Sequence, residues 1–252
     1  MHTEPALIHR EHFTIRSYEV DARKQVSIPS LIRLMQEASM QHVLHLQLSV
    51  WDLEPQGLSW VLIRQRMHVE RLPLLGETIE VVTHPSGFER VFTHRDFRMY
   101  DAQGAEIANA TTTWLLMHTA TRRMARIPAE LLAYNDLLPH PSGYLPRTAD
   151  KLPELGPVFR SRRFAVGWHD LDFNYHLTNS KYADWMLEAV DEHLLRNASL
   201  QTMDILYLAE SLWNEEIIAE TSISDNRTRL HRLTRPSDGK ELARARTVWS
   251  GG

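Results

Sequence analysis

The stretch that decides the fold reads Trp168-His-Asp-Leu-Asp-Phe-Asn-Tyr-His-Leu-Thr-Asn-Ser-Lys-Tyr-Ala-Asp-Trp-Met-Leu-Glu188. Its first part places polar side chains at alternate positions, and an apolar helical pattern follows them; these polar residues are Asp170, Asp172, Asn174 and His176. If the polar part is extended, its period of two directs all four side chains to one face, beside the N-terminus of the helix. A carboxylate, a carboxamide and an imidazole beside a helix dipole are the components of a hydrolytic or acyl-transfer site.

The helical pattern also occurs in the first half of the chain, which indicates an internal repeat. Three segments of the first half align, in order, with three segments of the second half. The pairs are residues 30–38 with 181–189, 74–81 with 212–219, and 104–114 with 239–249. The offset between the pairs falls along the chain, so the first copy carries extra residues after its helix. Two copies of one unit, a long helix followed by antiparallel strands, are the simplest account and predict an α+β fold.

Local patterns predict the elements of the first copy. Phe13 to Val20 alternates like a strand, and a helix begins near Ser27, which is a suitable N-cap with Pro29 in the first turn. Further strands are expected over residues 59–69, 78–83, 91–100 and 106–117. A proline-rich segment follows, and we interpret residues 134–157 as an extended linker. The expected domains are therefore residues 1–133 and 158–252.

Only the second copy retains the polar set. The positions that align with Asn174 and His176 are Arg23 and Gln25. If both copies held a site, both should keep the imidazole. We therefore expect the chemistry in residues 158–252 and a binding or structural role for residues 1–133.

Composition limits the classes of function. The chain has 252 residues, is 43% hydrophobic, carries a net charge of -4 and contains no cysteine. The charge argues against nucleic acid as the main partner, and the lack of cysteine excludes disulfides, thiolate metal ligands and thiol nucleophiles. No apolar run is long enough for a membrane span and the first residues do not resemble a secretory signal, so a cytoplasmic location is expected. The oligomeric state is left open, with a homodimer as one option.

The segment from Asp170 to Tyr182 resembles the motif of the fatty acyl-ACP thioesterases of plants and bacteria, Asp-Leu-Asp-x-Asn-x-His-x-x-Asn-x-x-Tyr. The resemblance extends to residues 13–20, to Gln36-Glu37-Ala38 and to residues 121–128. It implies a double hot-dog fold, in which each of two tandem units wraps an antiparallel sheet around a long helix. It also implies hydrolysis of the thioester that joins a fatty acyl chain to the phosphopantetheine arm of acyl carrier protein. We expect no cofactor, and no metal is required, because a thiolate is a good leaving group and a general base at neutral pH suffices.

The resemblance implies catalytic roles for Asp172, Asn174 and His176. The family places a glutamate, usually followed by cysteine, on the first long strand after the helix. Here residues 204–211 take that place, so Glu210 corresponds to the glutamate and Ser211 to the cysteine. Ser211 is a minor candidate for an oxygen nucleophile, because nothing nearby in the sequence indicates that it is activated.

The sequence is compatible with two mechanisms. In both, backbone donors around Leu177, Thr178 and Asn179, supported by Asn174, polarise the thioester carbonyl. Attack then comes from water activated by Glu210 with His176, or from Asp172 directly through a short-lived anhydride. Asp170 is expected to be structural.

An acidic carrier protein would need a basic docking surface. The arginines that we expect to supply it are Arg122, Arg123, Arg126, Arg160, Arg162 and Arg163. Residues of the first half should bound the acyl chain and set its length. The alternatives are an acyl-CoA thioesterase of the hot-dog class and a non-catalytic acyl-binding protein.

Metal sites receive little support from the sequence. Asp170, Asp172 and Asn174 match the start of a calcium loop, but Tyr175 and Lys181 stand where glycine and glutamate are required. A transition-metal site at His169, Asp172 and His176 is equally disfavoured. Five isolated histidines elsewhere in the chain are interpreted as surface or packing residues; they are His42, His45, His68, His94 and His118.

Overall fold

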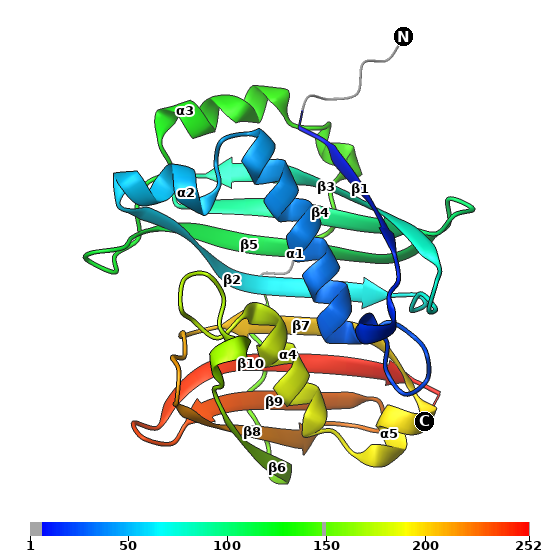
Figure 1. The fold of residues 1–252 in the computed structure, drawn as a ribbon. Coiled ribbons are helices and arrows are strands. Elements are labelled where there is room, and N and C mark those ends of the chain that lie inside the picture. The colour runs from blue at the N-terminus through cyan, green and yellow to red at the C-terminus, as the bar shows by residue number, and fades with distance from the viewer. Residues whose placement is uncertain (1–6, 148–149, 252) are drawn as a thin grey trace.

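A computed structural model describes residues 7–147 and 150–251 (Figure 1). Its strands form one antiparallel sheet of ten strands in the order β1-β3-β4-β5-β2-β7-β10-β9-β8-β6. Read inward from either edge, the first five strands and the last five follow the same order, because β1 to β5 correspond to β6 to β10. The topology therefore confirms the duplication inferred from the sequence.

The elements of the first copy are β1 (His9–Thr14), α1 (Ile28–His45), α2 (Val50–Leu53), β2 (Leu58–Val69), β3 (Thr78–Glu89), β4 (Phe92–Tyr100) and β5 (Glu106–His118). Those of the second copy are β6 (Val158–Ala165), α4 (Asn179–Glu188), α5 (Glu192–Asn197), β7 (Ser199–Tyr207), β8 (Glu216–Ile223), β9 (Thr228–Arg235) and β10 (Lys240–Ser250). The helix α1 is 18 residues long and α4 only 10, and α2 follows α1 in the first copy. This is the extra length that the falling offset predicted.

The two long helices lie on the same face of the sheet (Figure 1). The start of α1 is fixed as predicted, because the Ser27 side chain accepts a hydrogen bond from the Ser30 amide at 3.3 Å and Pro29 lies in the first turn. Its apolar face, which includes Leu31 and Met35, is buried in a core that continues through α4 into the second copy. Apolar burial of this kind is the main force that holds both helices to the sheet.

The two copies join edge to edge where β2 pairs with β7. At this seam the guanidinium of Arg64 on β2 forms two hydrogen bonds of 2.8 Å to the carboxylate of Asp204 on β7. Asp204 is almost fully buried, and a buried ion pair is destabilised strongly when one partner is removed.

Two predictions about local structure were wrong. The first strand is His9–Thr14 and not residues 13–20; a 3-10 turn at Ser17–Glu19 follows, in which the Glu19 carboxylate accepts a hydrogen bond from the Arg16 amide at 2.7 Å. The proline-rich segment is not simply extended. It follows the short helix α3 (Ala129–Leu132) and contains 3-10 turns at Ala133–Leu137 and Pro141–Gly143.

The proline-rich segment is anchored to the first copy. The Leu145 amide donates to the carboxylate of Asp96 on β4 at 2.8 Å, and Leu152 is buried. Proline is tolerated in the first turn of a helix, which explains how Pro141 starts a turn here. Residues 148 and 149 of this segment lie outside the described residues. The domain boundaries at 133 and 158 stay predictions.

Candidate active site

The segment that carries Asp172, Asn174 and His176 is a tight loop. The expectation that this segment is extended was therefore wrong. The Asp172 carboxylate folds back along the chain, and its Oδ1 accepts hydrogen bonds from the amides of Asn174 at 2.8 Å and His176 at 3.2 Å. Tyr175 has a φ of +62°, which lets the loop close through the Asp172 amide and the His176 carbonyl at 2.8 Å. Despite this, Asp172, Asn174 and His176 line one cavity.

The residues of the loop differ in exposure. Phe173 and Tyr175 are exposed, whereas Asp172 is partly buried. Burial raises the pKa of the Asp172 carboxyl above its ordinary value, against the opposing effect of the two amides that it accepts. Asp172 is thus both the residue that shapes the loop and a titratable group of the cavity wall.

Asp170 is a structural residue, as expected. Its Oδ2 accepts a hydrogen bond from the Gly167 amide at 3.0 Å, and its Oδ1 lies 3.3 Å from Nζ of Lys181. These contacts fix the turn before the loop to the first turns of α4. Asp170 is not among the residues that line the cavity.

Glu210 meets His176, although it does not lie on a strand. Its Oε2 is 3.3 Å from Nε2 of His176. The strand was expected to continue to residue 211, but β7 ends at Tyr207 because the amides of Leu208 and Ala209 both donate to the carbonyl of Leu242. This irregularity ends the ladder and turns Glu210 toward the loop.

Ser211 does not contact the imidazole. It is fully buried, and its hydroxyl donates to Oε2 of Glu215 at 2.6 Å. Burial alone would raise the pKa of Glu215, but hydrogen bonds from Ser211, the Leu212 amide and Arg235 hold it below its ordinary value. The hydroxyl therefore has a structural partner, Glu215.

Two of the three expected backbone donors already have acceptors. The Leu177 amide donates to the Ser211 carbonyl at 2.8 Å, and the Thr178 amide donates to the Asp170 carbonyl at 2.9 Å. The expectation that these two amides polarise a substrate carbonyl was therefore wrong. Within the described residues, the Asn179 amide at the first position of α4 and the side-chain amides of Asn174 and Asn179 have no hydrogen-bond partner.

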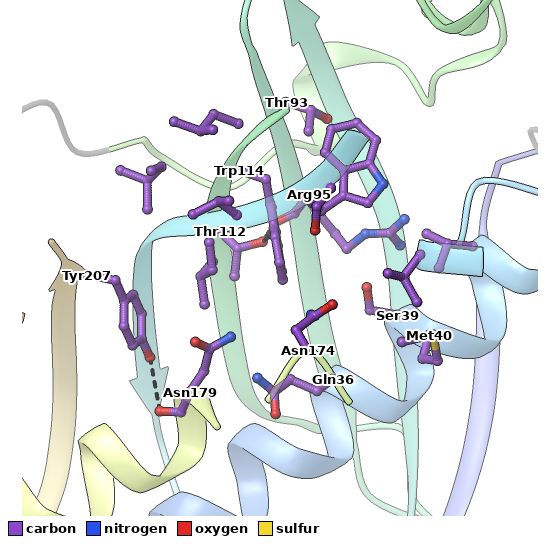
Figure 2. Close-up of a pocket in the computed structure, with 18 of the residues that line it drawn as sticks. Gln36, Ser39, Met40, Thr93, Arg95, Thr112, Trp114, Asn174, Asn179 and Tyr207 are labelled. Carbon is purple, nitrogen blue, oxygen red and sulfur yellow. Dashed lines mark hydrogen bonds between the residues drawn. The ribbon is translucent and has the colours of Figure 1, made fainter. Parts of the chain in front are cut away.

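A cavity of about 1030 Å³ connects this site with the first copy. One wall is α1 and the other is the sheet around β2, β4 and β5. Figure 2 shows Gln36, Ser39 and Met40 of α1 across from Trp114 of β5, with Asn174 between them. The apolar part of the lining includes Met40, Val43, Leu46, Trp60, Leu62, Phe97 and Trp114. A long apolar ligand fits a lining of this composition.

Arg33 and Arg95 line this cavity and were not predicted from the sequence, and of the two only Arg95 is buried. Arg95 of β4 is buried, and its Nη1 lies 3.0 Å from Nδ1 of His42 and donates to the Thr83 hydroxyl at 3.2 Å. Burial lowers the pKa of Arg95 to about 10, and burial together with Arg95 lowers the pKa of His42 to about 3. The alternation of β4 could have revealed it, since Thr93, Arg95 and Phe97 are buried at alternate positions and line the cavity. Figure 2 shows the first two of these side chains.

Of the histidines assigned to the surface or to packing, His42 is buried and stacks on His9 with ring centroids 5.4 Å apart. His94 differs from the assignment, because it lines the cavity. Within residues 7–147 and 150–251, His, Asp and Glu side chains form no group of three suited to a metal ion.

The six arginines expected to dock a carrier separate into two groups. Arg122, Arg123 and Arg126 follow β5, whereas the other three lie on β6, the strand at the far edge of the sheet; they are Arg160, Arg162 and Arg163. Six strand spacings of about 4.8 Å separate β5 from β6, so the two groups do not form one patch. Arg160 donates to the Val190 carbonyl at 3.0 Å, and Arg122 lies 2.5 Å from Glu210.

None of the helices in the described part of the chain combines the length and the apolar character needed to cross a bilayer. The sequence profile of the acyl-ACP thioesterase N-terminal domain matches residues 6–134, and that of the acyl-ACP thioesterase C-terminal domain matches residues 157–251.

Two curated plant proteins are similar over most of the chain. A chloroplastic palmitoyl-acyl carrier protein thioesterase of Cuphea hookeriana is 29% identical over 98% of this chain and 63% of its own length. A chloroplastic dodecanoyl-[acyl-carrier-protein] hydrolase of Cinnamomum camphora is 27% identical over 96% of this chain and 68% of its own length. This chain therefore spans less than two thirds of the first of these relatives.

Solved structures show the same fold. The 12:0-ACP thioesterase from Umbellularia californica superposes with a TM-score of 0.88 and 26% identity, over 98% of both chains. An acyl-ACP thioesterase from Bacteroides thetaiotaomicron gives a TM-score of 0.85 over 96% of this chain and 98% of its own, at 19% identity. The expected α+β double hot-dog fold is confirmed, and the chain belongs to the acyl-ACP thioesterase family.

Proposed function

We propose that this chain hydrolyses the thioester of fatty acyl-acyl carrier protein and releases a free fatty acid. The observation that carries the proposal is the meeting of His176 and Glu210 at a cavity whose remaining walls are largely apolar. An imidazole and a carboxylate at 3.3 Å supply the base that activates water, and the apolar cavity accommodates the acyl chain. The names of the plant relatives support the same substrate class.

The proposed mechanism uses water as the nucleophile. Glu210 and His176 hold a water molecule and accept its proton as it attacks the thioester carbon. The side-chain amides of Asn174 and Asn179 and the backbone amide of Asn179, which have no hydrogen-bond partner in the described structure, donate to the oxygen that becomes negative. The C–S bond then breaks, and the thiolate leaves with a proton from the imidazole. In this mechanism Asp172 acts by holding the loop, and Ser211 takes no part.

The two copies have different roles in this proposal. Residues 1–133 bind the acyl chain through α1, β2, β4 and β5, and residues 158–252 carry the catalytic groups. Residues 134–157 join the two. The lining supports this division, because most of the residues around the cavity belong to the first copy and the acyl chain must extend away from the reacting carbonyl.

The proposal is tested by thiol release from acyl-ACPs of increasing chain length, compared with acyl-CoAs of matched length. We expect acyl-ACP to be hydrolysed faster at every active length. Equal or faster hydrolysis of acyl-CoA would show that the enzyme is an acyl-CoA thioesterase. Retention of the acyl ligand without thiol release would contradict hydrolysis and support an acyl-binding protein.

The cytoplasmic location and a homodimer stay predictions, which cell fractionation and sedimentation can check.

A further inference from the structure

Among the residues that the structure describes, three arginines line the cavity, and they differ in their partners. Arg33 donates to the Ser30 hydroxyl at 2.8 Å, and Arg95 contacts neutral groups in the interior. Arg122 instead contacts a proposed catalytic group: its Nη2 lies 2.5 Å from Oε2 of Glu210. The same carboxylate oxygen lies 3.3 Å from the imidazole of His176. An arginine of the first copy therefore contacts the carboxylate that the proposed mechanism uses in the second copy.

The backbone around Arg122 is well defined. The residue lies in the turn after β5, where its amide donates to the His118 carbonyl and the His118 amide donates to the Arg123 carbonyl, both at 2.9 Å. Its φ is +57°, a conformation that residues other than glycine rarely adopt. The fold therefore fixes the point from which the guanidinium extends.

Glu210 has no comparable support of its own. It follows the end of β7, and its side chain is about a third exposed. Within the described residues, only Arg122 and His176 contact its carboxylate. A glutamate at such a site has several rotamers open to it, and ordering it costs entropy. A guanidinium held by a fixed turn reduces that freedom and keeps the carboxylate next to the imidazole.

The contact is a poor candidate for a purely stabilising ion pair. Half of the Arg122 side chain is exposed, and ion pairs at that degree of exposure contribute little to folding. The location of the Arg122–Glu210 pair indicates a different role, because the pair bridges the two copies at the residue where the chemistry is proposed.

We propose that Arg122 is a positioning residue for Glu210, so that the first copy completes the catalytic site of the second. The inference rests on the proposed function and removes Arg122 from the docking surface. Arg122 acts through the Glu210 carboxylate: it orients Oε2 toward His176 and toward the water that both groups share. It does not contact the carrier protein.

The test compares Arg122→Gln, Arg122→Lys and Arg122→Ala with a matched control, Arg227→Gln. Arg227 is exposed, does not line the cavity, and loses the same charge in the same substitution. We expect Arg122→Gln to lower kcat on acyl-ACP about 10- to 100-fold with KM within about twofold of wild type, because a misplaced catalytic group costs that much. Arg122→Lys should retain intermediate activity, and both should keep the wild-type Tm.

Chemical rescue separates positioning from a merely structural role. Guanidinium at millimolar concentration should restore part of kcat in Arg122→Ala, whereas the same concentration of sodium chloride should not. A raised KM with unchanged kcat would overturn the inference and return Arg122 to carrier docking. Unchanged kcat and KM would overturn it too, and so would loss of activity that follows a lowered Tm without rescue. If the wild-type enzyme releases no thiol from any acyl-ACP, the proposed function has failed instead.

Discussion

The Nε2 atom of His176 lies 3.3 Å from the Oε2 atom of Glu210, although one residue precedes α4 and the other follows β7. Two local features create this contact. The Asp172 carboxylate closes the loop that carries His176, and the converging amides of Leu208 and Ala209 end β7 before Glu210. The proposed base therefore depends on the conformation of two irregular segments as well as on the sheet.

Asp172 can be tested with two substitutions that separate shape from charge. In Asp172→Asn the remaining Oδ1 can still accept from the amides of Asn174 and His176, so we expect kcat to fall less than about tenfold. Asp172→Ala removes the acceptor and should lower kcat about 100-fold, because His176 loses its position. Both are measured as thiol release from acyl-ACP. If Asp172→Asn is as inactive as Asp172→Ala, the carboxylate itself reacts and the anhydride route is correct.

Ser211 should be dispensable for chemistry. Its hydroxyl donates to Glu215, which keeps hydrogen bonds from the Leu212 amide and Arg235 when the hydroxyl is removed. We expect Ser211→Ala to keep kcat within about twofold and to cost about 1 kcal/mol of unfolding free energy. Activity assays and urea denaturation of the same sample give both values. A loss of activity of several orders of magnitude in a folded variant would show that the serine is a nucleophile.

Stability should fall on the acid side because of a buried histidine. Burial lowers the pKa of His231 to about 3, and its ring nitrogens lie 3.0 Å from the Thr221 hydroxyl and 2.8 Å from the Thr247 hydroxyl. In the unfolded chain a histidine has a pKa of about 6.5. Below that pH the unfolded chain binds a proton that the folded chain does not, so the free energy of unfolding decreases by up to about 1.4 kcal/mol per pH unit as the pH falls.

We therefore expect His231→Gln to flatten the dependence of stability on pH between about pH 6 and about pH 4. The exposed His118 supplies the control, and His118→Gln should leave that dependence unchanged. Denaturant titrations at several pH values measure the slope. Equal slopes for wild type and His231→Gln would contradict the account.

The seam between the two copies should be sensitive to loss of one charge. Asp204→Ala leaves the guanidinium of Arg64 without the carboxylate that it contacts twice at 2.8 Å, and we expect a loss of about 3–5 kcal/mol in unfolding free energy. The exposed pair of Arg196 and Glu192 is the comparison, and Glu192→Ala should cost less than about 1 kcal/mol. Similar losses in the two variants would show that the seam pair contributes no more than a surface pair.

The regular parts of the fold were predictable because their signals are local. The N-cap at Ser27 and the strand-forming composition of residues 59–69 depend on residues within a single element. The order of the repeated segments also predicted that the topology is duplicated. The strand order of the sheet agrees with it in full.

The expected site residues meet at one cavity only in part, and their geometry was not predictable from the sequence. Asp172, Asn174 and His176 line the cavity, but so does Phe173 and Asp170 does not, because the segment is a turn with a positive φ at Tyr175 and not a strand. The end of β7 depends on the Leu242 carbonyl, which lies on the neighbouring strand. The contact of Arg122 with Glu210 joins the two copies, and no local pattern reports a contact between distant segments.

The most direct test of the central claim is the rate of free fatty acid release from acyl-ACP by Glu210→Gln compared with wild type, with both proteins shown to be folded by circular dichroism. Glutamine keeps the size of the side chain and removes the base that faces His176. The account predicts that kcat falls about 100-fold or more. Turnover by Glu210→Gln within about twofold of the wild-type rate would contradict it.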